Sequence, residues 1–255
     1  MSNSSLNQIQ KTHMDQAVQL ANKAVGHTSP NPAVGALIVK EGRIIGEGFT
    51  LPPGQHHAEI VALRQAGSQA NGSELYTTLE PCCTFGRTPP CTTAIIEAGV
   101  ETVFVASIDP NPQVSGKGCE TLREAGISVI ISTASGVPEL YEGFTKHILQ
   151  GIPFITAKYA MSLDGKIATA SGDSKWVTGT KSRLLVQELR NKCDAILVGI
   201  NTVLSDNPQL TCRDEFGDPL QRQPLRVVLD SKCRFPKYSR MLHEPGETLI
   251  ITSSD

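Results

Sequence analysis

The sequence predicts an α/β protein of two domains, with residues 1–150 in the first and residues 151–255 in the second. In the first part, amphipathic stretches with helical spacing alternate with short apolar runs that are typical of strands. A second series of such elements begins after Gly151-Ile152-Pro153, and its strand–helix–strand order indicates a parallel sheet. The length of 255 residues, 39% of them hydrophobic, allows one large packed domain or two ordinary ones.

The first domain is expected to contain a mixed sheet of about five strands, covered by helices in an α/β/α layering. Met14, Val18 and Val25 fall on one face of the first helix. The helices are expected at residues 10–25, 57–67, 91–98, 118–125 and 138–150. The strands are expected at residues 34–39, 43–48, 74–79, 102–107 and 127–131, and the first two form a hairpin around Lys40-Glu41-Gly42.

The second domain combines fewer elements. A buried strand is expected at residues 154–160 and a helix at residues 180–192. Further strands are expected at residues 195–199 and 225–230, and residues 247–252 have the pattern of a strand just beginning. Because parallel strands end at one edge of a sheet, a ligand crevice is expected there. The segment contains no G-x-G-x-x-G, so no dinucleotide site is identified by motif alone.

Residues 57–91 carry the parts of a hydrolytic zinc site. His57 and Glu59 lie at a predicted helix start, Cys82 lies at a strand exit, and Cys91 lies at a second helix start. One imidazole and two thiolates leave the fourth tetrahedral position open for water, whose pKa the metal lowers to about 7. Zinc deaminases combine such ligands with a glutamate two residues after the histidine, which carries protons. The sequence therefore predicts zinc at His57, Cys82 and Cys91, with Glu59 as the proton carrier.

Each of these residues alone has a simpler interpretation, because a lone cysteine is most often a small buried hydrophobe. Their order along the chain is what indicates a metal site. His56 lacks the two-residue offset to Glu59, and Cys83 is expected to point away from Cys82 where the backbone is extended. Eight residues separate Cys82 from Cys91, whereas the general zinc-deaminase pattern has two.

The amino-acid composition alone excludes few classes of function. A net charge of −2 provides no electrostatic argument for a nucleic-acid or membrane partner. The polar N-terminus MSNSSLNQIQ contains neither an apolar signal core nor an Arg-rich transit pattern, and no apolar run approaches the roughly 20 residues that span a bilayer. Seven cysteines suit a reducing compartment better than a disulfide framework. We therefore expect a cytoplasmic protein.

Five motifs together resemble the bifunctional deaminase–reductase family of riboflavin biosynthesis. They are SPNPAVG at residues 29–35, HAE at 57–59, LEPC at 79–82, GRTPPC at 86–91 and DPNPQVSGKG at 109–118. The long cysteine spacing and the GRTPPC run are typical of this family and not of cytidine or tRNA deaminases. Two local departures from its usual pattern occur: Cys83-Thr84 replaces Ser-His, and His56 replaces a non-histidine residue.

The resemblance implies a cytidine-deaminase-like zinc domain followed by a dihydrofolate-reductase-like domain, with Zn²⁺ and NADPH as cofactors. It implies hydrolytic deamination of 2,5-diamino-6-(5-phosphoribosylamino)pyrimidin-4-one to 5-amino-6-(5-phosphoribosylamino)uracil, then NADPH-dependent reduction of the ribosyl to the ribityl group. Matching motif to motif places the NADP contacts at Ala160, Trp176, Thr202, Asp206 and Ser231. It places the substrate contacts at Asn31, Ser174, Arg190, Leu210 and Arg213. The two arginines suit a phosphate, which their forked guanidinium groups bind with paired hydrogen bonds.

By the same resemblance, the reductase domain of the family continues for roughly another hundred residues and includes a Gly-rich cofactor loop. The second domain is therefore expected to be either C-terminally incomplete, as part of a fragment, or degenerate, and residues 1–255 are expected to deaminate rather than reduce. Two alternatives remain open. One is a nucleotide or tRNA-base zinc deaminase with an inactive tail domain. The other is a structural zinc module, although such sites usually fill all four positions with Cys or His. Homo-oligomerisation is also left open.

Overall fold

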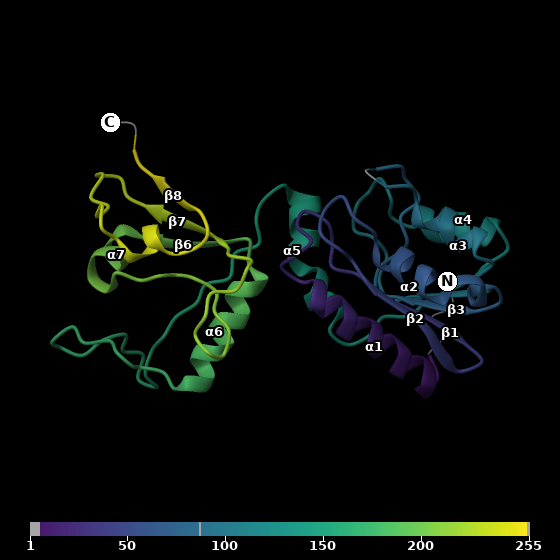
Figure 1. Ribbon diagram of the computed structural model, residues 1–255, viewed down its shortest axis with the longest axis horizontal. Coiled ribbons are helices and arrows are strands. Elements are labelled where there is room, and N and C mark those ends of the chain that lie inside the picture. The colour runs from purple at the N-terminus through teal and green to yellow at the C-terminus, as the bar shows by residue number, and fades with distance from the viewer. Residues whose placement is uncertain (1–5, 87, 254–255) are drawn as a thin grey trace. The chain divides into compact units, whose positions relative to one another are not determined.

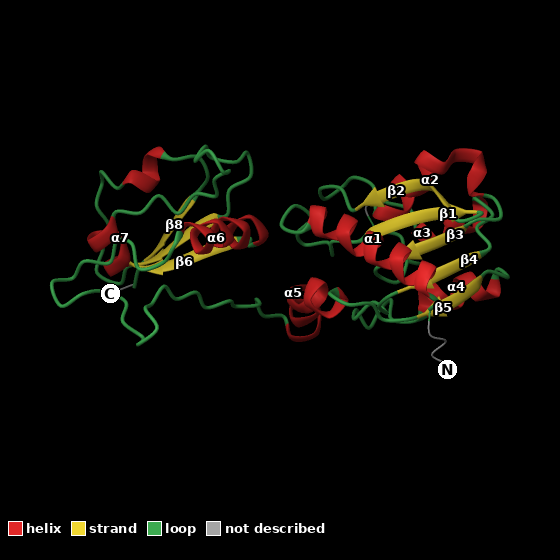
Figure 2. Ribbon diagram, turned by 90° about the horizontal axis from the view of Figure 1, so that it is seen from below, coloured by secondary structure: helices red, strands yellow, loops and turns green. Residues whose placement is uncertain are grey.

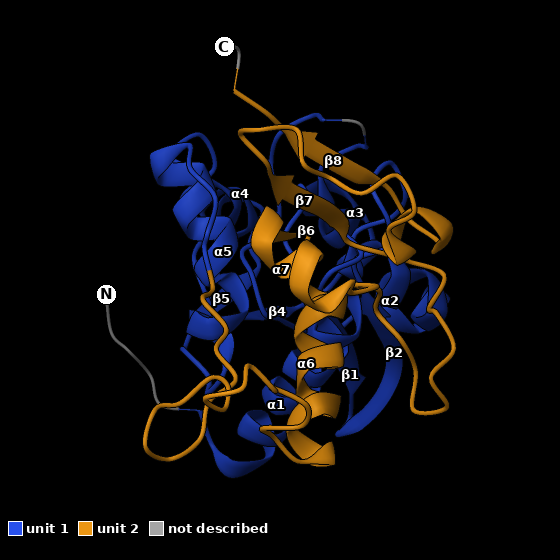
Figure 3. Cartoon of the chain, turned by 90° about the vertical axis from the view of Figure 1, so that its left-hand side faces the viewer, with its two compact units in different colours: residues 1–155 blue, residues 156–255 orange. Residues whose placement is uncertain are grey.

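The computed structural model describes residues 6–86 and 88–253. The chain divides into two compact units, residues 1–155 (unit 1) and residues 156–255 (unit 2), which Figure 3 shows in different colours. Arg87 of the GRTPPC run and the first five residues of the polar N-terminus lie outside the described residues. Among the described helices, none is both long and apolar enough to cross a membrane.

Unit 1 is built on one mixed sheet with helices packed against it (Figures 1 and 2). Its strands are β1 (Gly35–Lys40), β2 (Arg43–Phe49), β3 (Glu74–Thr77), β4 (Thr102–Val105) and β5 (Ser128–Ile131). Its helices are α1 (Gln8–Ala24), α2 (Ala58–Ala66), α3 (Cys91–Glu97), α4 (Lys117–Glu124) and α5 (Val137–Gln150), with a 3₁₀ turn, η1 (Gly67–Ala70), after α2. The strand order is β2-β1-β3-β4-β5. The predicted α/β/α layering is confirmed.

The strand directions bring distant parts of the sequence to one edge of this sheet. β1 pairs antiparallel with both β2 and β3, so β1 begins at the edge where its two neighbours end. β3, β4 and β5 run parallel, so the chain leaves β4 at that edge as well. The loop that contains Asn31 therefore reaches the sheet at this edge. At the same edge the chain leaves β2 toward His57 and leaves β3 toward Cys82. This gathers ligands that are far apart in the sequence.

Gly48 allows α2, which follows His57, to lie directly on β2. A Cβ atom at this position would stand 2.2 Å from the Ala58 carbonyl oxygen and 2.7 Å from the Ala62 nitrogen. Both are backbone atoms of α2, so no rotamer change can relieve such a contact. The absence of a side chain at Gly48 therefore decides how closely the start of α2 approaches the sheet.

Gly48→Ala is expected to lower the free energy of unfolding by about 1–3 kcal/mol, because the new methyl group overpacks the β2–α2 contact. Gly143→Ala in α5 is the matched control. Its Cβ would meet only the Phe154 Cβ at 3.7 Å, and alanine favours a helix over glycine. Denaturant unfolding of both variants checks the expectation. Equal stability of the two would contradict the close packing described here.

Unit 2 has a three-stranded parallel sheet in the order β6-β7-β8. The strands are β6 (Ala195–Gly199), β7 (Leu225–Leu229) and β8 (Thr248–Ile251), and the helical elements are α6 (Thr180–Lys192), α7 (Ile200–Asp206) and the 3₁₀ turn η2 (Arg240–His243). Val203 of α7 and Met241 of η2 pack on Val228 at one face of the sheet. On the opposite face, Leu197 is 60% exposed and Leu249 is 47% exposed.

The structure corrects two expectations for this unit. Residues 154–160 do not form a buried strand: they have no regular structure, and Ile155 and Tyr159 are 78% and 76% exposed. A strand persists only where a neighbour satisfies its backbone groups, and no described strand pairs with this segment. Residues 200–206, for which the sequence pattern predicted no element, form α7 directly after β6. Thr202 and Asp206 therefore lie on a helix and not in a loop.

Candidate metal centre

The three predicted zinc ligands meet in unit 1. His57 Nδ1 lies 3.5 Å from Cys82 Sγ and 3.3 Å from Cys91 Sγ, and the three ligand atoms all lie within 4.8 Å of one another. Ligands at the usual Zn–N and Zn–S bond lengths in a tetrahedron stand about 3.6 Å apart. The donor set and its spacing therefore fit a zinc ion with one open coordination position.

Each ligand is placed by the end of an element. His57 is the N-cap residue of α2 and has an extended backbone, with φ −71° and ψ 162°. Cys82 follows β3, and Cys91 is the first residue of α3. The Cys91 N–H donates to Cys82 Sγ at 3.3 Å. A helix N-terminus favours a thiolate, so α3 supports the negative charge that metal binding requires.

The protonation of the three ligands is linked. The Cys91 thiol donates a hydrogen bond to Cys82, which lowers the pKa of Cys82 and raises that of Cys91. The hydrogen bond to Cys82 also raises the pKa of His57, and the nearby Glu59 charge adds to the effect. The Cys91 thiol therefore keeps its proton more readily than the Cys82 thiol does. A bound metal cation would replace that proton, because a coordinating thiol is deprotonated.

Glu59 lies on the first turn of α2 and is buried, with 3% of its surface exposed. Burial and, next, the charge on Cys82 raise the pKa of its carboxyl to about 7, although the His57 charge acts in the opposite direction. A carboxyl that titrates near neutral pH can both take and return a proton. Its position two residues after His57, in the first turn of α2, suits a proton carrier beside the metal.

Cys83 and His56, which the sequence patterns did not favour as ligands, lie outside this group of ligand atoms. Cys83 is half-buried and is not part of the cluster of ligand atoms, and His56 contacts Arg64 instead. Within the described residues, His57, Cys82 and Cys91 form the one group of three side chains placed to hold a metal ion.

In unit 2, three of the residues matched to NADP contacts follow the ends of adjacent strands. Thr202 and Asp206 lie on α7 after β6, and Ser231 follows β7. Since β6 and β7 are parallel neighbours, Thr202 at the start of α7 and Ser231 after β7 lie near the carboxyl edge of the sheet, where nucleotides commonly bind, whereas Asp206 ends α7. Ala160 and Trp176 lie in the irregular segment before α6, and the Arg183 guanidinium stands 4.6 Å above the Trp176 ring.

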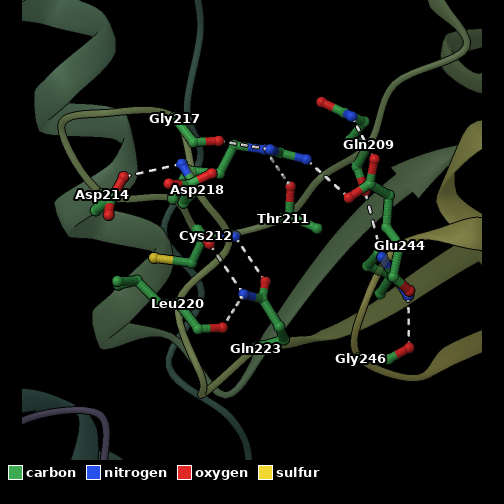
Figure 4. A network of polar contacts seen from close by, with 12 residues as sticks. Gln209, Thr211, Cys212, Asp214, Gly217, Asp218, Leu220, Gln223, Glu244 and Gly246 are labelled. Carbon is green, nitrogen blue, oxygen red and sulfur yellow. Dashed lines mark hydrogen bonds and ion pairs between the residues drawn. The ribbon is translucent and has the colours of Figure 1, made fainter.

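Two residues matched to substrate contacts meet around Thr211, which follows Leu210. Arg190 Nη1 donates to the Thr211 carbonyl oxygen at 3.0 Å, and Arg213 Nε donates to the Thr211 hydroxyl at 2.9 Å. Arg213 also pairs with Glu244 at 2.7 Å. Figure 4 shows Thr211 and Glu244 in the polar network of this region. A phosphate at Arg213 would therefore compete with the Glu244 carboxylate. Ser174 is half-buried in the irregular segment.

Two acidic side chains with many contacts were not singled out by the sequence patterns. One is Glu244, which lies 31 residues after Arg213. The other is Glu80, which is buried directly before Pro81-Cys82. The position of Glu80 at the exit of a buried strand could have indicated a structural role, because a buried carboxylate needs hydrogen-bond partners. Its partners come from other elements, so the sequence does not name them.

The comparisons with known proteins identify both units. Residues 7–107 match the family described as "Cytidine and deoxycytidylate deaminase zinc-binding region". Together with the three converging ligands, this makes unit 1 a zinc-binding deaminase domain of the cytidine deaminase class. Residues 153–255 match the family described as "RibD C-terminal domain".

Relatives that match both units are named riboflavin biosynthesis protein RibD. The protein from Aquifex aeolicus is 48% identical over 252 residues, which cover 98% of this chain and 70% of the relative. The protein from Escherichia coli is 45% identical over 253 residues, which cover 95% and 69%. A solved structure from Thermotoga maritima, a deaminase/reductase, superimposes with a TM-score of 0.88 at 46% identity and covers 97% and 70%.

This chain therefore belongs to the RibD family, the bifunctional deaminase/reductases of riboflavin biosynthesis. It spans between 64% and 70% of the length of the curated relatives that it matches. The predicted family, including its dihydrofolate-reductase-like second domain, is confirmed.

Proposed function

We propose that this chain deaminates a phosphoribosyl diaminopyrimidine. The substrate is 2,5-diamino-6-(5-phosphoribosylamino)pyrimidin-4-one, and the products are 5-amino-6-(5-phosphoribosylamino)uracil and ammonia. The observation that carries the proposal is the meeting of His57, Cys82 and Cys91 beside the buried carboxyl of Glu59. The Thermotoga maritima relative, which is named a diaminohydroxyphosphoribosylaminopyrimidine deaminase, supports this substrate class.

The residues of the site have separate roles in one hydrolysis reaction. His57, Cys82 and Cys91 would hold zinc, and the bound metal would supply a Lewis acid that makes water nucleophilic at neutral pH. Glu59 takes a proton from the attacking water and returns it to the 2-amino group, which leaves as ammonia. The ring carbon exchanges its C–N bond for a C–O bond, so no oxidant or reductant is needed. The buried position of Glu59 keeps bulk water from taking over the proton transfer.

We propose further that unit 2 contributes to the reductase step and uses NADPH. Its support is the match to the RibD C-terminal domain and the shared sheet edge of Thr202 and Ser231; Asp206, at the end of α7, is a further proposed contact. Arg190 and Arg213, which meet at Thr211, are the proposed contacts for the sugar phosphate. In this role the paired hydrogen bonds of a guanidinium group would fix the orientation of the phosphate.

For residues 1–255 alone, we expect ammonia release without NADPH oxidation. One face of the β6-β7-β8 sheet carries exposed leucines, so among the described residues no packed layer covers that face. Each missing charge-assisted bond to the nucleotide phosphates costs about 1–3 kcal/mol. Several such losses move binding from micromolar toward millimolar.

The measurement pairs ammonia release from the diaminopyrimidine with NADPH absorbance in the presence of the deaminated product. Deoxycytidylate and a tRNA substrate serve as comparison substrates in the first assay. Ammonia from either of these, and none from the diaminopyrimidine, would support a nucleotide or tRNA-base deaminase instead. Rapid NADPH oxidation by residues 1–255 would show that the cofactor site is already sufficient.

A further inference from the structure

Glu80 is a buried acidic residue to which the proton-transfer steps assign no task. Only 3% of its surface is exposed, and it stands two residues before the ligand Cys82. Its backbone extends the pairing of β3 with β4, because the Glu80 N–H donates to the Ser107 carbonyl at 2.8 Å. A carboxylate is buried at such a position only where hydrogen bonds compensate for the water it loses.

The Glu80 carboxylate accepts three backbone N–H groups from one distant stretch of the chain. Oε2 accepts from Asp109 at 3.1 Å and from Gly116 at 2.8 Å, and Oε1 accepts from Cys119 at 3.0 Å. Gly116 is the N-cap residue of α4 and has no side chain to cap the helix. Glu80 therefore supplies the cap from another element, and the positive end of the helix favours its charge.

The peptide after Glu80 is held on both sides. A Cβ atom at Gly118 in α4 would stand 2.1 Å from the Pro81 carbonyl oxygen, so α4 packs directly on this peptide. From α3, the Thr92 N–H donates to the Cys82 carbonyl at 3.2 Å, and the Cys91 N–H donates to Cys82 Sγ. The Cys82 backbone is thus placed between the starts of two helices.

We propose that Glu80 is a positioning residue for the metal centre. Its carboxylate ties the Pro81-Cys82 peptide to the loop after β4 and to the first turn of α4, and so decides where the Cys82 sulfur stands. This links the LEPC motif to the DPNPQVSGKG motif, which begin 30 residues apart in the sequence. The inference rests on the zinc site alone and is independent of the substrate that the enzyme uses.

Glu80→Gln tests the proposal, because the amide keeps the size of the side chain but can accept at only one of its two terminal atoms. Its NH₂ group must then face a backbone N–H. We expect the variant to bind Zn²⁺ about 10–100-fold more weakly in competition with a chelator, as is typical when a residue that supports a ligand is lost. The visible spectrum of the Co²⁺-substituted variant should change, and kcat should fall more than KM rises.

Two controls separate positioning from general stability. Glu120→Gln makes the same change at an exposed site of α4 and should match the wild type in every measurement. Leu122→Ala removes buried methyl groups from α4 and should lower Tm while leaving the Co²⁺ spectrum unchanged. If Glu80→Gln lowers Tm as Leu122→Ala does but keeps the wild-type Zn²⁺ affinity and spectrum, the proposal is overturned.

If Glu80→Gln does not fold, a second variant tests whether α4 helps to position Cys82. Gly118→Ala keeps the Glu80 carboxylate, but its new Cβ would stand 2.1 Å from the Pro81 carbonyl oxygen and 3.2 Å from both Glu80 Cγ and Oε1, so it presses on this peptide from the side of α4. Weaker Zn²⁺ binding and a changed Co²⁺ spectrum in this variant would support the coupling between α4 and Cys82. Wild-type values for both would overturn it.

Discussion

Replacing Glu59 with glutamine is expected to remove nearly all ammonia release while the chain still binds zinc. Glutamine has the same shape but can neither take a proton from water nor return one to the leaving amino group. Loss of one general acid–base catalyst typically costs about 10²–10⁴-fold in rate, or about 3–5 kcal/mol. Because both proton transfers use Glu59, the loss should exceed this range. Zinc should stay, because Glu59 is not one of the three ligands.

The measurement combines ammonia release with the zinc content of the purified variant. Glu101→Gln is the matched control, since it makes the same change at an exposed residue of unit 1. Turnover of Glu59→Gln at the wild-type rate would refute the assignment of the proton carrier. Loss of zinc from this variant would instead indicate that Glu59 is itself needed to hold the metal.

Cys91→Ser is expected to lose zinc, and Cys83→Ser is expected to keep it. Cys91 Sγ lies 3.3 Å from His57 Nδ1 and is buried, whereas Cys83 lies outside the ligand cluster. A serine hydroxyl stays protonated at neutral pH and is a poor substitute for a soft thiolate ligand. Zinc affinity of Cys91→Ser should therefore fall by more than the 10–100-fold that loss of a supporting residue costs.

Metal analysis of the two variants after dialysis against a chelator measures this difference. Ammonia release should follow the zinc content, so Cys83→Ser should remain active. The opposite result, with zinc retained in Cys91→Ser and lost in Cys83→Ser, would contradict the long cysteine spacing on which the metal centre rests. Both variants change one sulfur to oxygen, so each is a control for the other.

The sequence by itself determined the local parts of this protein. The helices and strands of unit 1 were predictable because their apolar spacing and their turn residues act over a few neighbouring positions. The identity of the ligands was predictable for a related reason. His57 and Glu59 have a fixed offset at a helix start, Cys82 lies at a strand exit, and few other structures use that order of residues. The family followed from motifs of the same short range.

Tertiary structure alone decided which elements become neighbours. Residues 154–160 have the apolar pattern of a strand but no described partner, and backbone pairing is a property of two segments. The closeness of Gly48 to Ala58, the pairing of Arg213 with Glu244, and the capping of α4 by Glu80 each join distant positions. Such contacts depend on sheet order and strand direction, which a local pattern does not encode. The sequence names the groups that bind zinc, and only the packing of β3, α3 and α4 decides where their atoms stand.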